Sequence, residues 1–100
     1  WTKWLKIWNP NMAQLKWSAS FKKDYPGLPE DMKKRPQKQF RILKQNPKHP
    51  SLQIKKTKGE VLRGYTDVFE GRINNNYRFL FVIDNDVFTL LRCGKHDEFF

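Results

Sequence analysis

The sequence has a single cysteine, two histidines and no apolar run long enough to cross a membrane. Cys93 has no second cysteine with which to form an internal disulfide, so nothing in the sequence ties the chain to an oxidising compartment. No stretch approaches the roughly 20 apolar residues of a membrane helix, and none has the order of charged, apolar and small residues that is typical of a secretory signal. We therefore expect a cytoplasmic protein.

The sequence also lacks the residue patterns of several kinds of catalytic site. The sequence has no glycine-rich loop to hold phosphate groups and no serine in the setting of a nucleophile elbow. The histidines and the cysteine are too scattered for a zinc site, and the 10 acidic residues are too dispersed for a metal cluster. We expect neither a metal nor another cofactor.

Acidic residues are scarce beside the 20 lysines and arginines, and the net charge is +10 in 100 residues. From Lys33 to Lys58 there are ten basic residues and no acidic one. Such a charge disfavours a compact state through self-repulsion and indicates an anionic partner, either nucleic acid or an acidic protein. The alternative is a solvated helix face that only keeps the protein soluble.

The N-terminal residues differ from the rest of the chain. Residues 1–11 contain three tryptophans at helical spacing and end at Asn9-Pro10, which stops a helix. We expect them to be an extension, either an upstream translation product or a weak membrane-surface anchor. The domain itself is expected to occupy residues 12–100.

The first half of this domain predicts one strand and two helices. Alternating apolar and polar residues over 13–18 indicate a short strand, and Ser18 or Ser20 would cap a short helix through Tyr25. A second helix should start at Pro29 and run to about Gln45. Because Pro36 interrupts this helix, we expect a kink or a break near Arg35.

The second half predicts consecutive strands without helices between them. These are expected at 52–56, 67–73, 77–83 and 87–93, with turns at 57–60, 74–76 and 84–86. An order of one strand, two helices and then four strands indicates an α+β domain. Its two N-terminal helices would pack on one face of a small twisted antiparallel sheet.

Arginines recur on the strand faces that point away from the expected helices. If a hairpin closes on Asn74–Asn76, Arg72 lies opposite Arg78; if the next closes on Asp84–Asp86, Arg78 lies opposite Arg92. Like charges placed opposite one another are destabilising, so a row of three arginines indicates a bound anion, and arginine suits phosphate. With a register shifted by one residue, each arginine would instead extend to a sheet edge.

His96 follows the last strand, after Gly94. Histidine exchanges a proton near neutral pH, and beside a phosphate held by arginines it could assist RNA cleavage by the neighbouring 2′-hydroxyl. Asp97 either orients the His96 imidazole or is solvated, and His96 itself could be a plain surface residue. His49, between Lys48 and Pro50, is expected to have no role.

Three short motifs resemble the RelE/ParE toxin superfamily. They are the segment 62–73, which reads LRGYTDVFEGRI, the strand start Tyr77-Arg-Phe-Leu-Phe81, and the ending Gly94-Lys-His-Asp97. The phrase His49-Pro-Ser-Leu52 also recurs in RelE-like members. The resemblance covers most of residues 12–100 and implies a small antiparallel sheet with two N-terminal helices.

The resemblance also implies a function and a set of residues. RelE-like toxins cleave messenger RNA, usually on the ribosome and without a metal, and are encoded beside an acidic antitoxin. This implies catalytic roles for Arg72, Arg78 and His96, with Glu70 and Asp97 as acid, base or orienting groups. The basic residues expected to contact RNA are Arg92, Lys34, Lys38, Lys44, Lys55, Lys56 and Lys95.

Two departures from the family pattern bear on activity. Some relatives have a basic residue where this chain has Glu70, and many have a C-terminal tyrosine where it has Phe100. ParE-like members share the fold but inhibit DNA gyrase and cleave nothing. The alternatives to an active ribonuclease are therefore a gyrase inhibitor and an inactive, basic RNA-binding member of the same fold.

Overall fold

The computed structural model describes most of the domain and none of the first 13 residues. The described residues are 14–47, 49–57, 64–65, 67–84 and 87–98. The predicted extension at 1–11 and the predicted turn at 57–60, apart from Thr57, lie outside them. No helix in these ranges is long and apolar enough to cross a membrane.

The first strand, β1 (Gln14–Trp17), leads directly into the first helix, α2 (Ala19–Asp24). The Oγ atom of Ser18 accepts a hydrogen bond from the backbone N–H of Phe21, at 3.1 Å, so Ser18 is the N-cap, one of the two serines that the sequence offers for this role. Two 3₁₀ turns follow, and the second spans Glu30–Met32.

The second helix begins later than its sequence signals predict. It is α3, Lys34–Gln45, and the break that the sequence predicts near Arg35 falls just before Lys34. Pro36 lies in the first turn of α3, where backbone N–H groups have no partner within the helix. The proline therefore fits the start of the helix and does not kink it.

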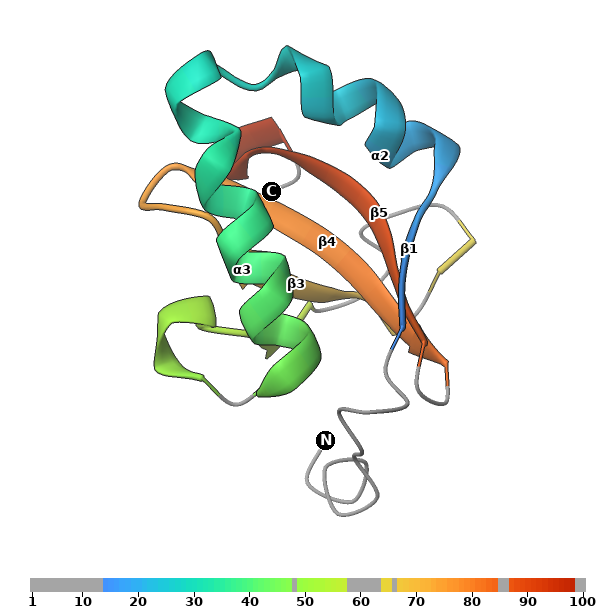
Figure 1. Ribbon diagram of the computed structural model, residues 1–100. Helices are drawn as coiled ribbons and strands as arrows, with labels where there is room; N and C mark the ends of the chain where they lie inside the picture. Colours follow the sequence, from blue (N-terminus) through green and yellow to red (C-terminus); the bar gives the residue numbers. More distant parts are fainter. Residues whose placement is uncertain (1–13, 48, 58–63, 66, 85–86, 99–100) are drawn as a thin grey trace.

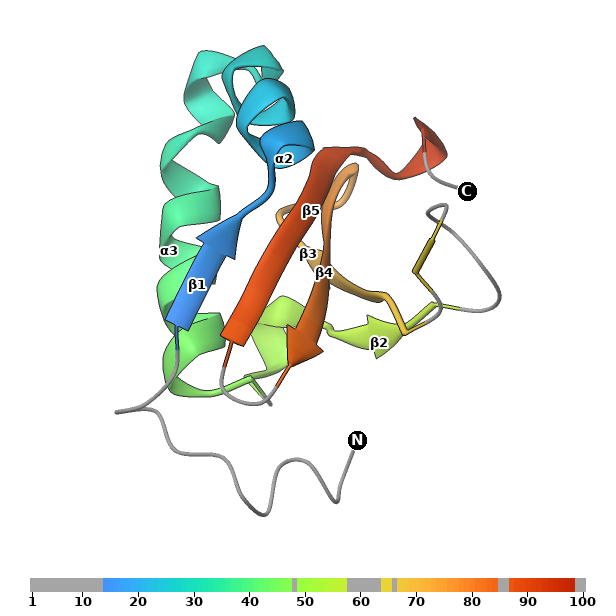
Figure 2. The same cartoon turned by 90° about the vertical axis from the view of Figure 1, so that its right-hand side faces the viewer.

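The sheet has five strands in the order β1-β5-β4-β3-β2. Beyond β1 these are β2 (Lys55–Lys56), β3 (Phe69–Arg72), β4 (Tyr77–Asp84) and β5 (Val87–Lys95). The predicted strand 52–56 is shorter than expected, because Pro50–Leu52 form a 3₁₀ turn that buries Leu52. Figure 1 shows α2 and α3 against the sheet, and Figure 2 shows both helices on the same side of it.

The prediction of a purely antiparallel sheet is wrong. β1 pairs in parallel with β5, with Gln14 opposite Val87, while the other neighbouring strands are antiparallel. Both helices follow β1, so they are not strictly N-terminal, and the order of one strand, two helices and then four strands is as predicted. After β1 the chain passes through both helices and then β2–β4, and β5 meets β1 running in the same direction. The fold is thus α+β with a mixed sheet.

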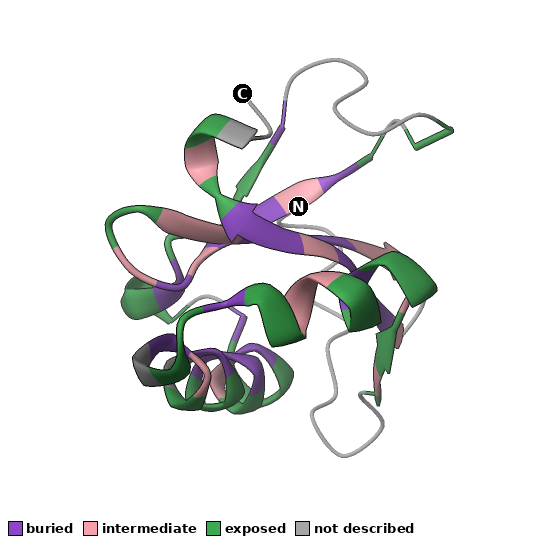
Figure 3. Cartoon of the chain, turned by 90° about the horizontal axis from the view of Figure 1, so that it is seen from above, coloured by how far each residue is buried: buried purple, intermediate pink, exposed green. Residues whose placement is uncertain are grey.

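The core lies between the helices and the sheet. The burial colours in Figure 3 show exposed outer helix faces and buried residues on the strands beneath them. Aromatic rings from both layers meet there, including Phe40 of α3 and Phe79 of β4, whose centroids are 5.2 Å apart. The fully buried members of this core are Phe21, Leu43, Leu52, Ile73, Phe79, Phe81, Phe88 and Leu90.

The β4–β5 register differs from the predicted one. Asp84 pairs with Val87 and Ile83 with Phe88, and a bulge between Leu80 and Phe81 shifts the pairing again. In this register Phe88 and Leu90 face the core beside Ile83 and Phe81, whereas the predicted register would have placed them on the opposite face. Burial of these two side chains selects the observed pairing.

Candidate active site

An open cleft of about 530 Å³ lies where the β3–β4 turn meets the end of β5. Its walls combine two cationic groups, a histidine, a carboxylate, two amides and a phenol. The residues that line it are Asn75, Asn76, Tyr77, Arg78, Lys95, His96 and Asp97. The cleft therefore brings together Arg78, Lys95, His96 and Asp97, four of the residues predicted from the sequence.

The backbone holds His96 against the β3–β4 turn. Its N–H donates to the carbonyl oxygen of Asn76 at 2.8 Å, so the chain stays beside β4 after β5 ends. The His96 side chain is 41% exposed, and its Nδ1 lies 3.9 Å from Oδ1 of Asp97. This distance is too long for a hydrogen bond. The imidazole is therefore accessible to a substrate in the cleft, with a negative charge close to it.

Arg78 reaches the cleft from β4, opposite Gly94, which has no side chain. Its Nη1 donates to the carbonyl oxygens of Asn74 and, at 3.0 Å, of Tyr77. These contacts do not use the Nε and Nη2 edge of the guanidinium. Arginine binds phosphate through such paired N–H groups. The geometry suits an anion in the cleft.

Arg72 pairs with Arg78 across β3 and β4, as the sequence predicts. Its guanidinium nevertheless does not line the cleft: Nη2 donates to Oδ1 of Asn75, and Nε is buried. The amide and carbonyl oxygens of the Asn74–Asn76 turn thus accept hydrogen bonds from both arginines. These contacts offset part of the repulsion between the two like charges.

The prediction that Arg92 is the third arginine of the row is wrong. Arg92 pairs with Leu80, not with Arg78. Its guanidinium binds Asp24 at the end of α2, with Nε 2.5 Å from Oδ2 and Nη2 3.3 Å from Oδ1. Asp24 also accepts a hydrogen bond from the N–H of Cys93. Arg92 therefore joins α2 to β5 instead of lining the cleft.

Glu70 is on the predicted face but also outside the cleft. It is only 2% exposed, and its Oε1 lies 3.2 Å from Nζ of Lys55 on β2. Lys56 forms a second ion pair with Asp67, at 2.9 Å. Both β2 lysines, predicted to contact RNA, are thus paired with carboxylates. Glu70 does not reach a substrate bound in the cleft, so its predicted acid–base role has no support in this geometry.

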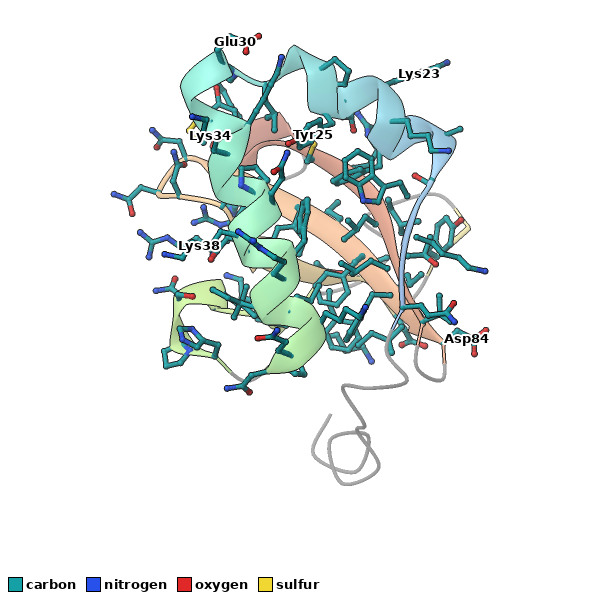
Figure 4. All side chains as sticks on the ribbon, viewed as in Figure 1. Lys23, Tyr25, Glu30, Lys34, Lys38 and Asp84 are labelled. Atoms are coloured by element: carbon teal, nitrogen blue, oxygen red, sulfur yellow. The ribbon has the colours of Figure 1, made fainter. Side chains whose placement is uncertain are left out.

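The exposed side of α3 is strongly basic. Within the part of the chain that the structure describes, none of its exposed cationic side chains has an acidic partner within ion-pair distance. Figure 4 shows two of them, Lys34 and Lys38, on the outer side of the helix. Among the α3 side chains that the structure describes, the exposed cations are Lys34, Lys38, Arg41 and Lys44.

Three residues of the cleft were not predicted as site residues. Asn75, Asn76 and Tyr77 were expected only to form a turn and to begin a strand, yet all three line the cleft. A signal existed, because this turn directly precedes Arg78 and so must lie beside its side chain. Among the described residues, no three His, Cys, Asp or Glu side chains come together as a possible metal site.

The chain matches no known family model and no curated protein sequence. Several solved structures nevertheless share its fold. One is YafQ from E. coli strain BL21(DE3), with a TM-score of 0.70 and 12% identity over 89% of this chain and 99% of that one.

Two other solved structures give the same result. The archaeal RelE–RelB complex from Pyrococcus horikoshii OT3 has a TM-score of 0.66 and 20% identity over 83% of this chain and 93% of that one. A copper-bound mutant toxin from Helicobacter pylori has a TM-score of 0.63 and 24% identity over 89% and 100% of the two chains. The chain has the fold of the RelE/ParE-like toxin superfamily, as its motifs indicate.

Proposed function

We propose that this chain is the toxin of a type II toxin–antitoxin pair and an endoribonuclease that cleaves messenger RNA on the ribosome. The observation that carries this proposal is the cleft, because Arg78, Lys95 and His96 all line it. A protein that only bound another protein would not need this combination of groups. The fold shared with RelE and YafQ supports the same class of function.

The proposed reaction is attack by a ribose 2′-hydroxyl on the adjacent phosphorus. A bond forms between O2′ and phosphorus, the bond from phosphorus to O5′ breaks, and the products are a 2′,3′-cyclic phosphate and a free 5′-hydroxyl. The proton lost from O2′ and the proton gained by O5′ are the two transfers in which His96 can take part. Arg78 and Lys95 stabilise the charge on the non-bridging oxygens. The resemblance implies that no metal takes part.

The basic side of α3 is the proposed contact with ribosomal or messenger RNA. Its cations lie on a single helix and are exposed, and the hydrogen bond from Asn74 to Met32 links the turn beside the cleft to the segment just before α3. Basic side chains that neutralise phosphates supply much of the affinity of such complexes. The helix would therefore hold the domain on the RNA while the cleft acts on one phosphate.

One observation favours a binding protein without catalysis as the second candidate. Arg72 and Arg92 both donate to groups of the protein itself, which leaves Arg78 as the only predicted arginine in the cleft. A ParE-like gyrase inhibitor or an inactive RNA-binding member could have such a site. Catalysis remains the better proposal because His96 and Lys95 join Arg78 there.

Induction in a bacterium separates these functions. The wild-type chain should stop growth and produce new messenger RNA 5′ ends within translated frames, and the His96→Ala variant should not. Intact messages together with gyrase-trapped DNA breaks would replace the ribonuclease with the ParE-like function. His49→Ala is the matched histidine control, because His49 caps the 3₁₀ turn Pro50–Leu52, outside the cleft.

The proposed partner is an acidic antitoxin. A net charge of +10 favours an acidic partner, and the solved structures with this fold include RelE–RelB and DinJ–YafQ complexes. An extended segment or helix of the antitoxin would cover the basic surface and the approach to Arg78. Co-expression with the neighbouring gene should raise the yield of the wild-type chain and lower the isoelectric point of the purified species. Accumulation of the lone wild-type chain in growing cells would contradict this proposal.

A further inference from the structure

The contact between Arg72 and Asn75 fixes the direction of an amide at the edge of the cleft. Arg72 Nη2 donates to Asn75 Oδ1. A guanidinium has only donors, so the atom that faces it must be the amide oxygen. The NH2 group of Asn75 is then the part of the amide left for another partner, and within the described ranges it donates to no protein group. Asn75 is exposed and lines the cleft.

Arg72 itself is poorly placed to bind a substrate. It does not line the cleft, and its Nε atom is buried without a hydrogen-bond partner among the described residues. Its position opposite Arg78 would otherwise indicate a second cation on the same phosphate. The structure therefore separates the two arginines: Arg78 faces the cleft and Arg72 faces the amide of Asn75.

The turn that carries Asn75 is held by its neighbours. Oδ1 of Asn74 accepts hydrogen bonds from the N–H of Asn76 at 2.8 Å and of Tyr77 at 2.9 Å, and its Nδ2 donates to Sδ of Met32 at 3.0 Å. Nη1 of Arg78 is bound to carbonyl oxygens of the same segment. The amide of Asn75 and the guanidinium of Arg78 thus belong to one hydrogen-bonded unit, which favours a fixed geometry between them.

We infer that Asn75 is a substrate-contacting residue, which donates from its NH2 group to a phosphodiester oxygen of RNA in the cleft, and that Arg72 is a positioning residue that acts through Asn75. This inference rests on the proposed function, because it uses the same cleft and the same substrate class. Arg78 and Lys95 supply positive charge to the phosphate. Asn75 adds a neutral, oriented donor, and Arg72 keeps that donor turned toward the RNA.

The Asn75→Asp variant separates this role from a structural one. A carboxylate still accepts the hydrogen bond from Arg72, so the melting temperature should be unchanged or higher. It cannot donate, however, and it places a negative charge beside the phosphate. We expect kcat/KM on ribosome-bound messenger RNA, and affinity for a message blocked by a 2′-deoxy nucleotide at the cleaved position, each to fall about tenfold or more. The Gln14→Glu variant gives the same charge change on β1, outside the cleft, and should match the wild type.

A double-mutant cycle tests the role of Arg72. If Arg72 acts through Asn75, the Arg72→Ala change should weaken RNA binding in the wild type and add no further loss to Asn75→Ala. Arg72→Lys should restore part of the loss, since an ammonium can also donate to the amide oxygen. Losses that add fully in the double variant would overturn the inference, because they would show that Arg72 contacts RNA by itself.

The outcomes distinguish this inference from the proposed function. If the wild type binds the blocked message but cleaves no unblocked one, and binding still falls with Asn75→Asp, the ribonuclease proposal fails and the contact stands. If the wild type cleaves and Asn75→Asp does so equally well, the contact fails and the ribonuclease proposal stands. A chain that neither binds nor cleaves messenger RNA overturns both.

Discussion

The ion pair between Asp24 and Arg92 allows a stability prediction with a worked magnitude. The carboxylate of Asp24 accepts two hydrogen bonds from the guanidinium of Arg92, at 2.5 and 3.3 Å, and a third from the N–H of Cys93 at 3.2 Å. These contacts join the end of α2 to the part of β5 that leads to His96. Removal of the carboxylate in Asp24→Ala breaks all three.

The expected loss follows from the burial of the two partners. A hydrogen bond to a charged group contributes about 1.5–3 kcal/mol when it is protected from water. The side chains of Asp24 and Arg92 are 18% and 38% exposed, so solvent screens part of the pair. The N–H of Cys93 also loses its acceptor, at a cost of about 1 kcal/mol or more. We expect Asp24→Ala to lower the free energy of unfolding by about 2–3 kcal/mol, or roughly 8–24 °C in melting temperature for a domain of this size.

Urea unfolding in a His96→Ala background measures this loss without toxicity. Asp24→Asn should lose about half as much, because the amide keeps one acceptor oxygen. Asp67→Ala is the matched control: its pair with Lys56 is also short, at 2.9 Å, but the two side chains are 75% and 57% exposed. It should change the free energy of unfolding by less than about 0.5 kcal/mol. Equal losses for Asp24→Ala and Asp67→Ala would refute the argument from burial.

Three further predictions concern packing, catalysis and RNA binding. Gly71→Ala should destabilise the fold by about 1–3 kcal/mol or more, as measured by urea unfolding, because a Cβ atom there would lie 2.2 Å from Cζ of Phe79. Gly27→Ala is the control, because a Cβ atom at Gly27 would have no atom within 4 Å. Arg78→Ala should raise the barrier to RNA cleavage by roughly 2–4 kcal/mol. His96→Ala should lower the cleavage rate about a hundredfold or more. A folded His96→Ala variant with wild-type activity would show that His96 does not transfer a proton. Replacement of the exposed α3 lysines by glutamine should weaken ribosome binding and flatten its dependence on salt, whereas an unchanged slope would mean that they serve only solubility. These lysines are Lys34, Lys38 and Lys44.

The sequence by itself determined the features that depend on near neighbours in the chain. Ser18 caps α2 and the Asn74–Asn76 turn closes between β3 and β4, since each uses hydrogen bonds that span only a few residues. The short turn then places Arg72 opposite Arg78, as predicted. β5 runs to Lys95, two residues beyond its predicted end, and His96 follows this strand directly, as expected, at the end of the sheet.

Only the tertiary structure decided the β4–β5 register and the direction of β1. The bulge beside Leu80 and the core positions of Phe88 and Leu90 depend on what packs against them, and the alternation of the sequence allows more than one register. Parallel pairing of β1 with β5 joins residues more than 70 positions apart, so no local signal reports it.

The same distinction explains which site residues were predicted. Arg92 has the sequence pattern of an anion ligand, but its guanidinium binds the carboxylate of Asp24 instead. The two residues are 68 positions apart in the sequence. Asn75 has the pattern of a plain turn residue, but in the folded chain its amide oxygen accepts a hydrogen bond from Arg72 and the residue lines the cleft. Residue type and spacing determine which groups can bind phosphate. Which of them can do so depends on the partners that the fold brings to each, because an N–H edge that already binds a protein group must lose that partner before it can bind an anion.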